Sequence, residues 1–240
     1  MSAKLSGTNY PTVLSLPDQK SYELAYSLAL AMAVEKLGRR DEIAEQCRRS
    51  GSTYDTSGPA PVIYTQYLNR TYRITLPDVS VSLAESEDKV ELRDKVLILH
   101  YLGRARGTPV EGKLISYQEL GEGAGYYPSF FQRAIKPLVD CFGPTPEKLL
   151  SSAAELGGCR ANYGDASVTI EAFNRVSVTL IVWKGDEEFP PNASILFDHT
   201  VLDYLSAEDI NVLCQTLTWR LAKSLKSDIP DIVPSVANDQ

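Results

Sequence analysis

The chain has 240 residues, of which 43% are hydrophobic and 23% charged. This is the composition of a globular protein, and it excludes a disordered or fibrous chain. The 24 basic and 31 acidic residues give a formal net charge of −7. That balance argues against a protein that binds nucleic-acid backbones through clustered Lys and Arg. A single domain of this length buries a substantial core without disulfides or a structural metal.

The sequence predicts a cytoplasmic protein that does not contact membranes. Its first residues carry no basic segment followed by an apolar one, so no secretory signal is expected. The longest apolar stretch, Leu24 to Val34, is too short to cross a bilayer. The four cysteines form no CxxC pair, so we expect neither a zinc ribbon nor an iron–sulfur cluster. With only two histidines, an all-His metal site is excluded.

The first half of the chain mixes helical and strand patterns. Residues 1–17 are predicted to be an irregular arm, because Pro11 and Pro17 interrupt regular structure. The first helix is apolar nearly all round, so we expect it to be central and buried. The predicted elements are helices at 21–37 and 41–49, a loop at 50–61, a hairpin at 62–69 and 71–76, a third strand at 79–83 and a helix from Val90 to Leu102.

The second half repeats this alternation. Ser206 and Asp209 form a pattern like a capping box at the start of the last helix. The whole pattern predicts an α+β fold, with a single domain at 18–226 that has two antiparallel β regions packed among helices, and a flexible tail at 227–240. The predicted elements are a strand at 114–117, a glycine loop at 121–125, helices at 129–142, 145–156 and 206–225, and strands at 167–173, 176–183 and 193–197.

Carboxylates give the first candidate site. Asp186, Glu187 and Glu188 form an acidic turn, and Asp198 ends the following strand. Neighbouring carboxylates can hold a hard cation or supply an acid and a base. Consecutive acidic residues in a hairpin are more often a solvated turn. Alternatively, Asp198 caps the next short helix, and Asp186 or Glu188 pins a neighbouring loop.

The two histidines give the second candidate site. His100 lies close to the buried stripe of its helix, where a lone His is more often a hydrogen-bonded core residue than a ligand. The functional alternative is axial ligation of a haem iron or a corrinoid cobalt by His100 or by His199. Neither histidine lies in an Asp-x-His-x-x-Gly pattern, which argues against a conventional cobalamin fold.

Aromatic residues give the third candidate site. They gather around Gly121–Gly125, which lacks the Lys-Ser/Thr ending of a phosphate loop and is interpreted as a turn. Such a cluster lines a ligand pocket or a protein interface, or it packs against its own core. No GxSxG, HExxH or Cys-His nucleophile pattern is present. The ligand-binding candidates are therefore His100, Tyr117, Glu119, Tyr126, Tyr127, Phe130 and Trp183.

Several segments resemble the domain-of-unknown-function 3786 family from about residue 20 to 225. The resemblance is densest over 183–210, where Trp-Lys-Gly-Asp-Glu-Glu-Phe-Pro and Ser-Ile-Leu-Phe-Asp occur. His199 and Phe173 depart from the expected pattern. Shorter matching pieces are Leu99-His100-Tyr101-Leu102, Ser116-Tyr117-Gln118-Glu119-Leu120-Gly121, Tyr126 or Tyr127 with Phe130, Phe142-Gly143 and Leu156-Gly157-Gly158.

The resemblance implies a cytoplasmic protein of anaerobic bacteria or archaea, linked to one-carbon or metallocofactor metabolism. Some family members carry an additional iron–sulfur domain similar to that of the corrinoid protein of acetyl-CoA synthesis, which this chain lacks. The resemblance implies no reaction and no catalytic residues.

Three hypotheses follow from the sequence. The leading one is a non-catalytic binding or accessory module that acts with a corrinoid or iron–sulfur protein partner. The second is direct binding of haem or a corrinoid, with His100 as the axial ligand. The third is an enzyme that uses the carboxylates of Glu119, Asp186, Glu188 and Asp198, which would have to converge in one pocket.

Overall fold

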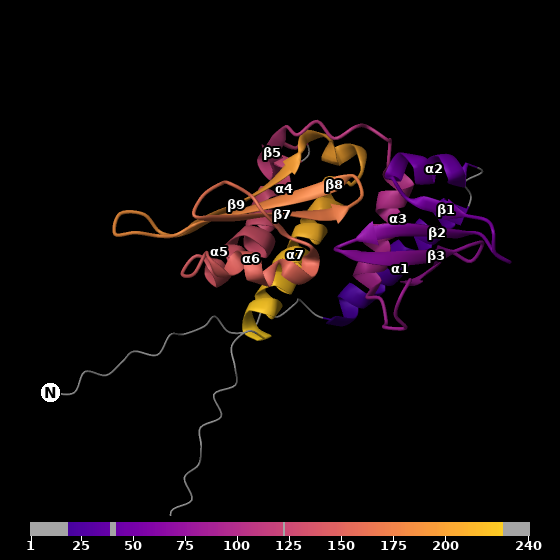
Figure 1. Ribbon diagram of the computed structural model, residues 1–240, viewed down its shortest axis with the longest axis horizontal. Coiled ribbons are helices and arrows are strands. Elements are labelled where there is room, and N and C mark those ends of the chain that lie inside the picture. Colours follow the sequence, from indigo (N-terminus) through magenta and orange to yellow (C-terminus); the bar gives the residue numbers. More distant parts are fainter. Residues whose placement is uncertain (1–18, 39–41, 122, 228–240) are drawn as a thin grey trace, which may run out of the picture.

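The two β regions of the chain join into one antiparallel sheet of nine strands. The computed structural model describes residues 19–38, 42–121 and 123–227. Helices pack around this sheet (Figure 1), so the predicted α+β fold is confirmed. The predicted arm at 1–17 lies outside the described residues, as does the predicted tail beyond Ser227.

The N-terminal half is built on a tight β-hairpin. The hairpin turns at Leu68 and Asn69, whose φ angles are 47° and 62°. Positive φ at both turn residues matches the right-handed twist of the flanking strands. The elements of this half are α1 (Gln19–Gly38), α2 (Ile43–Ser50), β1 (Thr53–Asp55), β2 (Val62–Tyr67), β3 (Arg70–Thr75), β4 (Ser80–Leu83) and α3 (Leu92–Arg104).

Helix α1 is not the central buried helix that its composition predicts. It packs on α3 through one face, on which Ala33 and Leu37 are buried. The opposite face exposes Leu24 to 74% and Leu28 and Met32 to 63% each. A helix that is apolar all round does not reveal from its sequence how many of its faces have neighbours.

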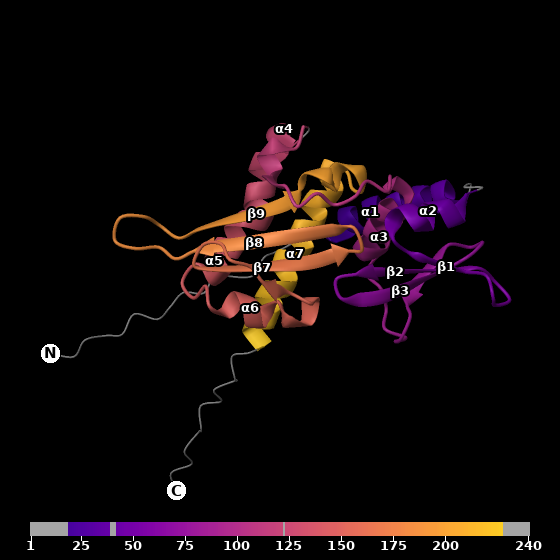
Figure 2. The ribbon, with the colours of Figure 1, turned by 45° about the horizontal axis from the view of Figure 1, so that its top comes forward.

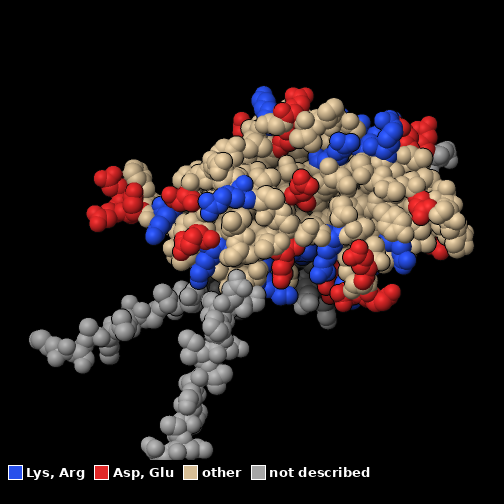
Figure 3. Space-filling view, viewed as in Figure 1, with Lys and Arg blue, Asp and Glu red and all other residues tan. Residues whose placement is uncertain are grey.

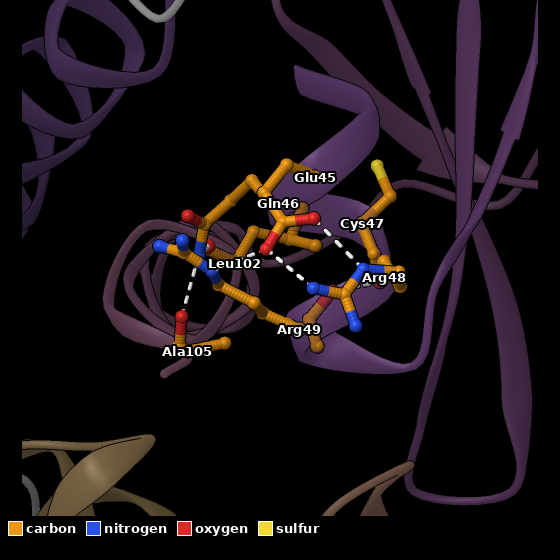
Figure 4. A network of polar contacts seen from close by, with 8 residues as sticks. Glu45, Gln46, Cys47, Arg48, Arg49, Leu102 and Ala105 are labelled. Carbon is orange, nitrogen blue, oxygen red and sulfur yellow. Dashed lines mark hydrogen bonds and ion pairs between the residues drawn. The ribbon is translucent and has the colours of Figure 1, made fainter. Parts of the chain in front are cut away.

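Helix α2 is fastened to the end of α3 through Gln46 (Figure 4). The Gln46 side-chain amide donates to the carbonyl oxygens of Leu102 and, at 3.0 Å, Ala105. On the outer side of α2, Glu45 accepts hydrogen bonds from Arg48 and Arg49, which lower the pKa of Glu45 to about 2. The two bonds from Gln46 fix the C-terminal end of α3, the helix that carries His100.

The C-terminal half is a three-stranded meander covered by helices. In Figures 1 and 2, α5, α6 and α7 lie against one face of β7, β8 and β9. The long hairpin between β8 and β9 projects beyond the rest of the molecule in both views. The elements of this half are β5 (Leu114–Ser116), α4 (Gly123–Phe130), α5 (Lys136–Phe142), α6 (Lys148–Ser152), β6 (Cys159–Arg160), β7 (Ala166–Phe173), β8 (Val176–Trp183), β9 (Asn192–Asp198) and α7 (Ala207–Ser227).

A short ladder joins the two predicted β regions. Strands β2 and β7 share the register pair Tyr67–Phe173, and the amide of Leu68 donates to the carbonyl oxygen of Ala172 at 3.0 Å. The Phe173 ring lies 4.8 Å from the Tyr67 ring and 4.2 Å from the Tyr101 ring, measured between centroids. All three residues are almost completely buried, so the junction between the halves is part of the core rather than a linker.

The predicted glycine loop at 121–125 is wrong over its second half, because α4 begins at Gly123 rather than at Ser129. A side chain at Gly123 would collide with the carbonyl oxygen of Tyr117. This glycine permits a close approach between backbones instead of forming a turn. From α4 the chain continues through a wide π-helical turn, Phe131–Ile135, into α5.

Two further predictions need correction at short elements. The helix predicted from Thr145 begins as an α-helix only at Lys148, because the amides of Lys148 and Leu149 bond three residues back and form a tighter turn. The α-helix ends at Ser152, and a separate 3₁₀ turn, Ala154–Leu156, continues to Gly157, where the φ of 70° ends the helical segment as predicted. Strands β1 and β6 have three and two residues and are too short for a periodic pattern to be visible in the sequence.

Within the described residues, no helix combines the length and the apolar character needed to span a membrane.

Candidate functional site

The strongest polar pairing at a predicted site residue joins His100 to Asp209. His100 lies on α3, and its Nδ1 is 2.7 Å from Oδ1 of Asp209 in the first turn of α7. The other Asp209 oxygen accepts hydrogen bonds from the hydroxyl and amide of Ser206, and the Asp209 amide donates to the Ser206 hydroxyl. The predicted capping box is therefore confirmed.

The environment of this pair favours the ionised form of Asp209. Burial acts to raise the pKa of Asp209, but hydrogen bonding and charge interaction with His100, together with the bonds from Ser206, lower it overall. The ionised carboxylate is placed to accept a hydrogen bond from Nδ1, and this arrangement leaves Nε2 of His100 as the nitrogen available to a metal. The His100 side chain is 37% exposed, so it borders solvent instead of filling the core.

His199 lies in the 3₁₀ turn that follows β9, in a looser environment. Its Nε2 is 3.6 Å from a Glu111 oxygen, and its Nδ1 is 3.7 Å from Oδ1 of Asp198. Both distances exceed a hydrogen bond, and the buried Nδ1 has no hydrogen-bond partner. Unlike His100, this imidazole has no carboxylate that holds its ring in one orientation.

Asp198 caps the short helix after β9, which was the structural alternative predicted for it from the sequence. Its Oδ1 accepts hydrogen bonds from the amide and hydroxyl of Thr200, and its Oδ2 accepts from the amides of Glu111 and Gly112. Burial raises the pKa of Asp198, but these bonds outweigh it and lower the pKa. The carboxylate thus ties the end of β9 to the loop before β5.

The aromatic cluster divides into core and surface. Tyr117 and Phe130 stack with centroids 4.0 Å apart, and each is 1% exposed. The Tyr117 hydroxyl donates to the carbonyl oxygen of Ala207, and burial raises the pKa of Tyr117 to about 12. Tyr127 is partly buried beside Phe130, whereas Tyr126 is 64% exposed.

The hydrogen bonds of Glu119 also hold local structure. Its Oε2 accepts hydrogen bonds of 2.7 Å from both the amide and the hydroxyl of Ser116, which completes a capping box around the 3₁₀ turn Tyr117–Glu119. The backbone bond and then the hydroxyl bond of Ser116 lower the pKa of Glu119.

The acidic turn forms the hairpin tip, which we define as residues 184–191 between β8 and β9. Oδ1 of Asp186 accepts hydrogen bonds from the amides of Glu188, at 2.9 Å, and Phe189, at 2.7 Å. These bonds, that of Phe189 first, lower the pKa of Asp186. Asp186 therefore pins its own turn and not a neighbouring loop. Trp183, the last residue of β8, is 38% exposed.

The carboxylates of the enzyme hypothesis do not meet in one place. Asp186 and Glu188 lie at the hairpin tip, whereas Asp198 lies at the opposite end of β9. A strand of this length spans roughly 20 Å. Among the residues that the structure describes, no three His, Cys, Asp or Glu side chains gather as they would to hold a metal ion.

The sequence profile of the family described as domain of unknown function (DUF3786) matches residues 42–220, which is well over half of the chain. The chain belongs to the DUF3786 family. No curated protein and no solved structure matched it. The DUF3786 match includes His100, Asp209 and the hairpin tip, whereas α1 precedes it.

One charged cluster of this DUF3786 chain escaped the sequence analysis. Asp94 on α3 is 3% exposed, and its carboxylate lies 2.5 Å from a guanidinium nitrogen of Arg220 on α7 and 3.0 Å from the hydroxyl of Tyr67. Nε of Arg93, 4.0 Å from the same carboxylate, is buried without a hydrogen-bond partner. The only signal in the sequence is that Asp94 lies on the buried stripe of its helix, four residues before Ile98.

Proposed function

We propose that the protein is a cytoplasmic, non-catalytic binding or accessory module that acts with a corrinoid or other metallocofactor protein in an anaerobe. The observation that carries the binding role is the projecting β8–β9 hairpin, whose tip exposes Phe189 to 68%. Large exposed aromatic side chains are enriched at protein interfaces. The association with metallocofactor proteins is supported by the family resemblance, which is an analogy.

The bonding of the candidate carboxylates supports a non-catalytic role. Asp198, Glu119 and Asp186 each accept at least two hydrogen bonds that hold local backbone. Each has a lowered pKa, so each stays ionised at neutral pH. A general acid or base works best with a pKa near the operating pH and with free access to substrate.

A binding measurement tests the proposal. Biolayer interferometry under anaerobic conditions would pair the full chain with a purified corrinoid iron–sulfur protein. We expect a saturable one-to-one complex that Phe189→Ala weakens and Trp219→Ala leaves unchanged. Trp219 is the control, because it is an exposed aromatic residue on a different element, α7, and is not one of the candidate site residues. No complex at any accessible concentration would overturn the proposed association.

The His100–Asp209 pair favours a second candidate function, direct binding of haem or a corrinoid. A metal-ligating histidine almost always donates its other ring N–H to a carboxylate, a carbonyl or water, and Nδ1 of His100 has such a partner at 2.7 Å. His100 would then hold the metal through Nε2, and Asp209 would orient the imidazole. The bound group would supply metal-centred chemistry.

An absorbance titration of the anaerobic protein with haemin and with cobalamin, followed by native mass spectrometry, tests this second function. We expect a spectral shift that saturates at one equivalent and is lost in His100→Ala. The His199→Ala variant is the control and should keep the shift. An unaltered spectrum, or a shift that survives in His100→Ala, would rule out ligation by His100.

A further inference from the structure

The hairpin tip is held in one conformation by contacts along its whole length. Besides the two bonds that Asp186 accepts, its amide donates to the carbonyl oxygen of Phe189 at 2.9 Å. The amide of Lys184 donates to Asp165 at 2.7 Å and ties the base of the tip to the preceding hairpin. At Gly185 a side chain would lie 2.6 Å from the ring of Pro191, so the two ends of the tip pack closely. A loop already ordered in its free state loses little conformational entropy on binding.

The tip presents apolar side chains that are exposed instead of packed against the core. Phe189 is 68% exposed, and the neighbouring prolines, Pro190 and Pro191, are exposed as well. Figures 1 and 2 show this segment beyond the end of the sheet, away from the helices that cover the core. Within the part of the chain that the structure describes, most of the aromatic ring is therefore left exposed, whereas a partner pocket would bury it.

Charge surrounds this ring. Asp186, Glu187 and Glu188 immediately precede Phe189, and Figure 3 shows carboxylates gathered at the projecting end of the molecule. Anionic lipid headgroups and nucleic-acid phosphates would be repelled by three adjacent carboxylates. The complementary surface is a protein surface that carries Lys and Arg.

We infer that the hairpin tip is a docking surface in which Phe189 inserts into an apolar pocket on a partner protein, and Glu187 and Glu188 face Lys or Arg at the rim of that pocket. This inference rests on the proposed function, because it assumes that the chain acts by binding a protein. It adds the chemistry of the partner surface and the residue that anchors it. Aromatic residues that are exposed in the free protein and fill a well-packed pocket of the partner are the usual hot spots of interfaces. Charges at the rim mainly set the association rate and its dependence on salt.

A photo-cross-linking experiment identifies what the tip touches. The full chain would carry benzoylphenylalanine in place of Lys184, an exposed residue at the base of the tip, and would be irradiated in native anaerobic cell extract. The same substitution at Lys113, at the opposite end of β9, is the control. Mass spectrometry of the cross-linked peptides should place the Lys184 product on a partner segment with Lys or Arg beside apolar residues.

The identified partner is then the probe for affinity. We expect Phe189→Ala to weaken its binding by about 30-fold or more, and Phe189→Leu by less. The double variant Glu187→Gln/Glu188→Gln should slow association and flatten its dependence on salt, and Trp219→Ala should change neither. All four positions are exposed, so the variants keep the fold.

The outcomes separate this inference from the proposed function. A partner that binds equally well to Phe189→Ala, or the absence of any cross-link from position 184, overturns the docking tip but leaves a binding module that uses another surface. A partner that is cross-linked and weakened as expected, but that holds no corrinoid or other metallocofactor, supports the docking tip and overturns the proposed association. A metallocofactor protein that is cross-linked at position 184 and binds more weakly to Phe189→Ala supports both the docking tip and the proposed association.

Discussion

Asp209 and His100 connect the first turn of α7 to α3, with 2.7 Å between Oδ1 and Nδ1. The same carboxylate closes the capping box of α7 through its other oxygen. One side chain therefore starts a helix of the C-terminal half and holds an imidazole of the N-terminal half. This double use explains why the Asp209 pKa falls although the group is largely buried.

Replacing Asp209 by Asn should lower the free energy of unfolding at pH 7 by about 1–3 kcal/mol, because charge-assisted hydrogen bonds are lost. The lowered pKa of Asp209 sets the pH dependence. A depressed folded-state pKa contributes stability that is fully present above the unfolded value of about 3.9 and is lost as the pH falls through the folded value.

The difference in the free energy of unfolding between wild type and Asp209→Asn should therefore become smaller below about pH 4. Urea unfolding, monitored by circular dichroism at pH 7 and at pH 3, measures this difference. The neighbouring exposed Glu208, changed to Gln, is the control. An equal difference at both pH values would show that Asp209 does not act through its charge.

Gly123 and Gly125 form a matched pair in α4. Gly123→Ala should destabilise the protein by about 1–3 kcal/mol, because the added methyl group collides with the Tyr117 carbonyl. Gly125→Ala should be neutral or stabilising by up to about 1 kcal/mol, since nothing lies within 4 Å of its added Cβ. Thermal and urea unfolding of both variants measure the contrast, and equal effects would contradict the placement of α4.

The same glycines show what the sequence could and could not predict. The stripe of α7, its capping box and the β2–β3 hairpin depend on neighbouring residues, and periodicity predicted them. The start of α4 depends on a backbone contact between Gly123 and Tyr117 that no local pattern encodes. Glycine-rich segments look like turns unless the close approach that requires them is known.

Candidate sites followed the same rule. The capping role of Asp198 depends on Thr200, two residues away, and capping chemistry anticipated it. Its bonds from the amides of Glu111 and Gly112, 87 and 86 residues away, were not predicted. The partner of His100 is 109 residues away, and that of Asp94 is 126 residues away. A single sequence does not reveal such pairs, so the Asp94 cluster was missed entirely and His100 was singled out without its carboxylate.

Breaking the buried pair of Asp94 and Arg220 should be costly. Arg220→Met leaves the Asp94 carboxylate buried with the Tyr67 hydroxyl at 3.0 Å and the Arg93 guanidinium no closer than 4.0 Å, and we expect a loss of about 3–5 kcal/mol. The double variant Asp94→Asn/Arg220→Met should lose less than the sum of the single losses, because the unpaired charge is gone.

The control for this cycle is a surface pair. Arg106 and Asp203 are 3.1 Å apart, with the Arg106 side chain 67% exposed, and Arg106→Met should cost no more than about 1 kcal/mol. Urea unfolding at one pH measures wild type, the single variants Arg220→Met and Asp94→Asn, their double variant and the control Arg106→Met. Additive losses in the Asp94–Arg220 cycle would show that the two groups do not stabilise the fold as a pair.

The aromatic cluster should separate into structural and surface residues when each ring is removed. Phe130→Ala takes away a ring stacked 4.0 Å from Tyr117 and touching Phe197, so it should destabilise the protein by about 3–5 kcal/mol. Tyr126→Ala removes a ring that is 64% exposed and should change stability by no more than about 0.5 kcal/mol. Because the two residues are four positions apart on α4, any general weakening of the helix would affect both. A large loss in Tyr126→Ala, or a small one in Phe130→Ala, would contradict the burial of Phe130 and the exposure of Tyr126.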